Sequence, residues 1–188
     1  MSFDIEDSNI VEVLAGMKHS TVFGHGLVGL NRSLIGGIGS STSYGKVMML
    51  ECDRHQHDNV SPHSHPYDMV CLVVEGFAIN RLWHKTDKDD GDLFELSSVS
   101  KNDSLPSKGG YDLDAKEAGY YKSSTERYTK GELYSMKSDE LHTVWFSKGA
   151  KVLVFQGEPK THTRFILDPV VDGAAVHAGV SWMFGGEL

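Results

Sequence analysis

The chain has 188 residues, 39% of them hydrophobic and 23% charged, which is the composition of an ordinary globular domain with a sizeable core. Its formal net charge of -8, without a block of Lys or Arg, disfavours nucleic acids and anionic membranes as partners. Two cysteines cannot form a disulfide framework, and neither a secretory signal nor an apolar stretch of about 18 residues is present. We therefore expect a cytoplasmic protein.

The first expected element is a short N-terminal helix, which Asp7 or Ser8 caps and whose apolar residues recur at helical spacing. Gly24, Gly26 and Gly29 then break regular structure, and Gly36, Gly37 and Gly39 with the following serines predict a glycine-rich loop. The helix and this glycine-rich arm together occupy residues 1–45.

From residue 46 onward the pattern is mostly that of β-structure. Short apolar runs separated by turns predict strands over residues 46–52, 69–74, 77–83, 133–136, 143–146 and 151–155. Residues 85–130 are more polar and predict either a long excursion from a hairpin or a partly helical lid. Many short strands with a single helix predict an antiparallel sandwich or barrel.

Four of the ten histidines, at positions 55, 57, 63 and 65, fall within one short stretch. Alternate residues of a strand share a face, so His63 and His65 are expected to project to the same side. Two imidazoles placed in this way can bind one first-row metal ion if another strand adds a third ligand. Pro62 and Pro66 indicate that a strand begins here, near a rim. We assign His55 and His57 to a solvated loop, with a position beside the substrate as the alternative.

The segment from Ser61 to Gly76 resembles the first motif of the cupin superfamily. That motif has a His-x-His pair, a glutamate three or four residues later, and a glycine that ends the strand. With Gly76 as this glycine, Met69 takes the glutamate position, so the resemblance implies that the fourth ligand is absent or displaced. Asp68 stands one place earlier and becomes a ligand if a bulge turns it inward. Alternatively, its carboxylate bonds a ligand histidine or a backbone amide.

The second cupin motif begins with a glycine and ends with a histidine, and Gly131 and His142 match these two at the family's separation. The resemblance covers residues 46–157 and implies an all-β double-stranded β-helix, the cupin jelly roll. We expect a cupin β-barrel domain over residues 46–167 with an insertion at 85–130. A C-terminal extension, residues 168–188, mixes small and aromatic residues and is expected to pack across an edge or a partner subunit. The resemblance also implies a homodimer.

These motifs predict one divalent metal ion held by His63, His65 and His142, with Asp68 as the possible fourth ligand. Open positions on such an ion accept a chelating substrate and dioxygen on Fe(II), or polarise a carbonyl or water on Zn(II), Mn(II) or Ni(II). Our leading hypothesis is a mononuclear Fe(II) dioxygenase of a small organic acid. The alternatives are a non-redox isomerase or lyase and a ligand-binding cupin without turnover.

Three further side chains are expected at the mouth of the barrel and are candidates for substrate contacts: Tyr67, Arg81 and Tyr134. Arg81 suits a substrate carboxylate because a guanidinium binds it through two parallel hydrogen bonds. The alternative is an arginine that faces outward from its strand. Trp83 and Trp145 are expected to fill the core.

Overall fold

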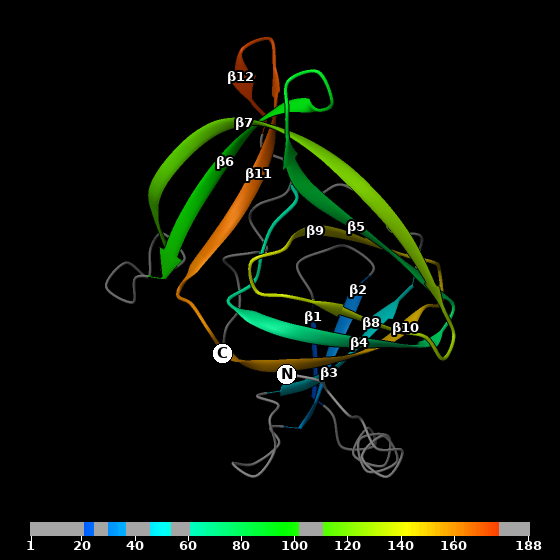
Figure 1. Ribbon diagram of the computed structural model, residues 1–188. Helices are drawn as coiled ribbons and strands as arrows, with labels where there is room; N and C mark the ends of the chain where they lie inside the picture. The colour runs from blue at the N-terminus through cyan, green and yellow to red at the C-terminus, as the bar shows by residue number, and fades with distance from the viewer. Residues whose placement is uncertain (1–20, 25–29, 37–45, 54–60, 102–110, 177–188) are drawn as a thin grey trace.

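A computed structural model describes residues 21–24, 30–36, 46–53, 61–101 and 111–176 of the chain (Figure 1). These residues form two antiparallel sheets of six strands each, and no helix occurs among them. Consequently this part of the chain also holds no helix that is long and apolar enough to cross a lipid bilayer. The expected N-terminal helix, the glycine-rich loop at residues 37–39, and His55 and His57 lie outside the described residues.

The two sheets account for all twelve strands. In sheet order, the first contains β1 (Thr21–Gly24), β2 (Leu30–Gly36), β3 (Lys46–Cys52), β10 (Lys151–Pro159), β4 (Tyr67–Glu75) and β8 (Leu133–Met136). The second contains β12 (Ala174–Ala175), β11 (Thr163–Val171), β6 (Asp92–Lys101), β7 (Tyr111–Thr129), β5 (Phe77–Thr86) and β9 (Leu141–Phe146).

Strand β10 lies at the centre of the first sheet and is buried on both faces. Val152 and Val154 pack into a core that also contains Ala78 and Phe146 from the second sheet, so this core lies between the sheets. Alternate residues of β10, beginning with Leu153, pack into a separate apolar cluster on the outer face. This burial on both faces explains why β10 appears in the sequence as an unbroken apolar run.

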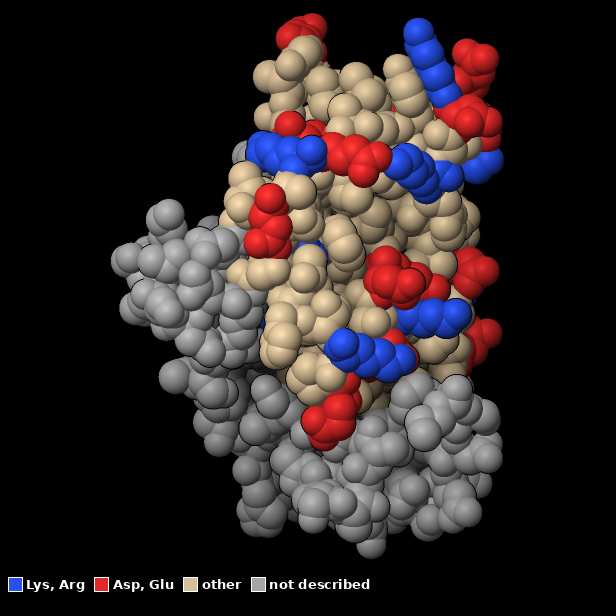
Figure 2. Space-filling model, turned by 60° about the vertical axis from the view of Figure 1, so that its left-hand side comes forward, with Lys and Arg blue, Asp and Glu red and all other residues tan. Residues whose placement is uncertain are grey.

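The polar stretch at residues 85–130 is a long hairpin over its described parts, formed by the end of β5 with β6 and β7. The hairpin alternative is confirmed there, and no helical lid is present among the described residues. Most β7 side chains are exposed, and several pair with charged neighbours, as Lys85 does with Glu117 at 2.6 Å. Basic and acidic side chains lie next to one another on this part of the surface (Figure 2). Solvation of this face explains why the sequence has few apolar residues here.

The expectation of a closed barrel is wrong for the described strands, because the two sheets share no strand ladder. The irregular segment 61–66 instead lies between β9, an edge strand of the second sheet, and β11 of the same sheet. His63 forms isolated bridges with His142 of β9 and with Ile166 of β11. The backbone N–H of Ser64 adds a hydrogen bond to the carbonyl of Phe165 at 2.9 Å. The segment that carries His63 and His65 therefore contacts two strands of the second sheet, β9 and β11.

Candidate metal centre

His63 and His65 lie just before β4, which begins at Tyr67, and not on its first residues as expected. Pro62 and Pro66 explain the difference, because a residue without an N–H cannot donate to a regular ladder. Of the two histidines, only His63 forms a backbone bridge. Its N–H donates to the His142 carbonyl at 3.1 Å, and the His142 N–H donates to the His63 carbonyl at 3.0 Å. These two bonds hold the histidine segment directly beside the strand that carries the third histidine.

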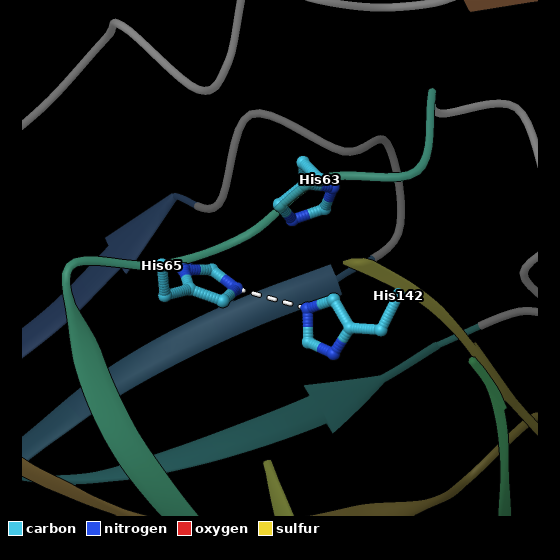
Figure 3. Close-up of side chains that lie close together, drawn as sticks. All are labelled: His63, His65 and His142. Carbon is cyan, nitrogen blue, oxygen red and sulfur yellow. Dashed lines mark hydrogen bonds between the residues drawn. The ribbon is translucent and has the colours of Figure 1, made fainter. Parts of the chain in front are cut away.

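The three imidazole rings meet at one point between these segments (Figure 3). Ring centroids lie 5.0 Å apart for His63 and His65, 5.1 Å for His63 and His142, and 5.0 Å for His65 and His142. The Nε2 atoms of His65 and His142 are 3.0 Å apart, and one ligand nitrogen from each ring lies within 4.8 Å of the other two. The predicted convergence of histidines from two distant segments is therefore confirmed.

Burial favours the neutral form of His63 and His142, which is the form that binds metals. It lowers the pKa of His63 to about 4 and the pKa of His142 well below its ordinary value. Because a carbonyl can only accept, the contact of His63 Nδ1 with the Ser61 carbonyl at 3.0 Å places the proton on Nδ1. Nε2 is then the atom that His63 can offer as a ligand.

Strand β11 supports the histidine segment through contacts that the sequence did not predict. Ser61 Oγ donates to Asp168 Oδ1 at 2.5 Å, and both residues are buried. The Leu167 N–H donates to the Pro62 carbonyl at 2.8 Å, and the Phe165 N–H donates to Ser64 Oγ at 2.9 Å. An aspartate directly after the apolar run at residues 165–167 was the only available signal, because buried carboxylates need partners.

Asp68 is turned away from the three histidines. Its neighbour Tyr67 packs against the core between the sheets, and successive strand residues point to opposite faces. The Asp68 carboxylate accepts a hydrogen bond from the Ser138 N–H at 2.9 Å and forms an ion pair with Lys160. The structure therefore brings the three histidines together without Asp68, and the backbone-amide alternative describes its contacts.

Only one of the three substrate candidates lies beside the histidines. Tyr67 stacks on His65 with ring centroids 5.6 Å apart and an interplanar angle of 20°. Arg81 pairs with Thr143 across β5 and β9, and its guanidinium lies 5.9 Å from the Trp145 ring. The next residue pair along these strands is Leu82 with His142. Because neighbouring pairs point to opposite faces, Arg81 projects from the face of the sheet that lies opposite His142.

Tyr134 lies inside the core between the sheets and is 5% exposed. Its ring stacks on Tyr128 at 4.7 Å, and its hydroxyl shares a hydrogen bond with the Cys71 thiol. Burial, with a smaller effect of Cys71, raises the pKa of Tyr134 well above its ordinary value. Tyr134 is thus a neutral core residue in this arrangement.

Of the two tryptophans expected to fill the core, Trp83 packs against an apolar cluster, whereas Trp145 is partly buried and belongs to none of the clusters among the described residues. Trp83 packs with Phe94 at 5.1 Å between ring centroids, in a cluster that also contains Leu167. His84 and His162 are exposed, and His84 Nε2 lies 3.3 Å from the Ser124 hydroxyl. Neither histidine belongs to the three-histidine cluster that could hold a metal ion.

No family model and no curated protein matches the sequence. Among solved structures, KdgF from Halomonas sp. is similar at 12% identity and a TM-score of 0.39, over 76% of this chain and 91% of that one. The Drosophila melanogaster CENP-C cupin domain is similar at 7% identity and a TM-score of 0.39, over 74% of this chain and 76% of that one. Hydroxypropylphosphonic acid epoxidase from S. wedmorenis is similar at 10% identity and a TM-score of 0.40, over 75% of this chain and 56% of that one. Two antiparallel sheets and a cluster of three histidines are the features that the resemblance to the cupin jelly roll implied.

Proposed function

We propose that this chain is a metal-dependent cupin enzyme whose ion is held by His63, His65 and His142. The observation that carries this proposal is the convergence of three mostly buried imidazoles on one point. Two nitrogens bound to one ion at about 2.0–2.1 Å lie roughly 3 Å apart when their bonds are near a right angle. The Nε2 atoms of His65 and His142 are already 3.0 Å apart, so this pair of donors fits such an ion.

The donor set points to the chemistry. Three neutral imidazoles leave the full charge of a divalent ion uncompensated, and this favours a chelating organic anion as substrate. Bound Fe(II) would supply open positions for such a substrate and for dioxygen. The chain itself orients the ligands: the Ser61 carbonyl fixes the proton of His63, and the Tyr67 ring stacks on His65. We therefore favour an Fe(II) dioxygenase-type reaction on a small organic acid.

A second candidate is a non-redox isomerase or lyase, because the same three imidazoles also suit Zn(II), Mn(II) and Ni(II). Such an enzyme would stay active after replacement of iron by a redox-inert ion. A third candidate is a cupin that binds its ligand without turnover. It would show thermal stabilisation by the ligand and no product.

Elemental analysis of purified protein tests the metal centre. We expect about one equivalent of metal in the wild type and only a trace in His63→Ala, because removal of one of three ligands destroys the site. His84→Ala is the matched control, since His84 is exposed and lies outside the cluster. Equal trace contents in all three proteins would exclude the proposal.

The reaction type requires a second measurement. We expect anaerobically Fe(II)-loaded protein to consume dioxygen with at least one member of a panel of chelating organic acids. Full iron occupancy without uptake for any acid would exclude the dioxygenase. Product formation by Zn(II)-loaded or Mn(II)-loaded protein would then assign the non-redox reaction.

A further inference from the structure

The sequence suggested Arg81 as the residue that binds a substrate carboxylate, but a different arginine faces the histidines. Ile166 of β11 forms an antiparallel bridge with His63, so the two side chains share a face of the sheet. Arg164 precedes Ile166 by two residues on the same strand and therefore points to that face as well. The register thus places Arg164 on the face of β11 that carries the histidine cluster.

Two further observations agree with this orientation of Arg164. The residue between Arg164 and Ile166, Phe165, lines a surface groove together with Asp68, on the side turned away from the histidines. Next to the larger effect of burial, the positive charge of Arg164 also lowers the pKa of His63, as expected for a cation that lies close to this ring. Arg164 is partly exposed, so a ligand can reach it.

The neighbouring strand adds a hydrogen-bonding group to this face. Ser97 of β6 pairs directly with Ile166, so its side chain projects to the same side as Arg164 and His63. Ser97 is 3% exposed, and its hydroxyl has no hydrogen-bond partner in the part of the chain that the structure describes. Buried hydroxyls are nearly always paired, so one that lacks a partner beside a metal-ligating cluster indicates a place for a ligand.

We propose that Arg164 and Ser97 form a subsite for the distal carboxylate of an organic acid whose other end chelates the metal ion. This inference rests on the proposed function, because the chelating end needs the ion. A guanidinium donates two parallel hydrogen bonds to a carboxylate, and the serine hydroxyl donates a third. The substrate class is then a 2-hydroxy or 2-oxo diacid rather than a monoacid.

The test compares Co(II)-loaded wild type, Arg164→Gln and Ser97→Ala, with Arg81→Gln as the matched control on the opposite face of the sheet. The probes are malate and 2-hydroxyglutarate, which carry a second carboxylate, and 2-hydroxybutyrate, which does not. Binding is followed by calorimetry and by the visible spectrum of cobalt. We expect the wild type to prefer at least one diacid by tenfold or more, and Arg164→Gln to lose this preference while binding cobalt and 2-hydroxybutyrate unchanged.

Ser97→Ala should weaken diacid binding by a smaller factor, and Arg81→Gln should behave as the wild type. A wild type that binds cobalt but shows no preference for either diacid, or an Arg164→Gln variant that keeps the preference, would overturn the subsite. If the wild type binds no cobalt, the proposed metal centre fails separately. Diacid binding to the metal-free protein then decides: binding that Arg164→Gln abolishes supports the subsite, and no binding overturns it.

Discussion

Ser61 and Asp168 stand 107 residues apart in the chain, yet the Ser61 hydroxyl donates to the Asp168 carboxylate at 2.5 Å inside the protein. The carbonyl of the same serine accepts the Nδ1 proton of His63 at 3.0 Å. Asp168 is 0% exposed and Ser61 is 1% exposed, so water does not compete for this contact. Strand β11 thus positions Ser61 through Asp168, and the carbonyl of Ser61 in turn orients His63.

We predict that Ser61→Ala weakens the affinity of the protein for Zn(II) by about tenfold, because outer contacts that orient a ligand histidine typically contribute this much. Asp168→Asn should produce a loss of similar size, since it removes the negative charge that strengthens the bond. A competition titration with a chromogenic chelator measures both affinities. Ser124→Ala, which changes an exposed hydroxyl near His84, is the control.

A double variant of Ser61 and Asp168 shows whether the two residues act on Zn(II) binding together or independently. If Ser61 and Asp168 act through one hydrogen bond, Ser61→Ala with Asp168→Asn should bind Zn(II) about as weakly as either single variant. Additive losses, or affinities equal to that of the wild type, would contradict the positioning of His63 by this pair.

A second prediction concerns Asp68 and the dependence of stability on pH. Partial burial raises the pKa of Asp68, but hydrogen bonds from Lys160 and Ser138 outweigh this effect, and the net pKa lies below its ordinary value. A carboxyl with a depressed pKa in the folded state stabilises the fold above its unfolded pKa, and this contribution is lost as the pH falls through the folded pKa.

We therefore expect Asp68→Asn to lower the free energy of unfolding at pH 7 by at most about 1 kcal/mol, as is usual for a partly exposed ion pair. The difference from the wild type should disappear in acid below the folded pKa of Asp68. Urea unfolding across this pH range measures it. Metal content should stay unchanged in Asp68→Asn, and a loss of one equivalent would instead make Asp68 a ligand.

The central strands and the histidine cluster could be predicted from local pattern, whereas the contacts that support the cluster could not. Apolar runs predicted β3, β4, β8, β9 and β10. These strands have either one buried face, where every second residue is apolar, or two buried faces, where nearly every residue is. Strands β6 and β7 carry many solvated, ion-paired side chains, such as Lys116 with Glu95 at 2.5 Å, and therefore lack that signal. For the contact of Ser61 with Asp168, the sequence offers only the aspartate after the apolar run at residues 165–167, because the partner depends on how β11 packs beside residue 61.

A third prediction concerns the reactivity of Cys71. Burial raises the pKa of its thiol to about 12, and its hydrogen bond with Tyr134 only partly offsets this effect. Since the thiolate is the nucleophile, we expect alkylation by iodoacetamide at pH 8 to be on the order of a thousandfold slower in the native protein than in urea. Mass spectrometry of the Cys71 peptide measures the rate. Rapid labelling of a protein that remains folded would show that the thiol is accessible.

The two glycines that match the cupin motifs offer a matched pair of stability measurements. Both have positive φ, 74° at Gly76 and 88° at Gly131, so a β-carbon strains the backbone at either position. At Gly131 an added β-carbon meets no atom within 4 Å, and Gly131→Ala should cost only this strain, about 1 kcal/mol. At Gly76 the β-carbon would lie 2.5 Å from Ser147 Oγ, which already accepts a hydrogen bond from the Phe77 N–H at 3.0 Å.

Because that hydrogen bond and the nearby Ala150 backbone restrict any shift, Gly76→Ala should destabilise the protein by roughly 1–3 kcal/mol more than Gly131→Ala. Denaturant unfolding of both variants measures the difference. Equal losses would mean that Ser147 moves aside freely and that Gly76 is required only for its backbone angle. A larger loss at Gly76 would show that the close approach of β4 and β5 to the turn before β10 also requires a residue without a side chain.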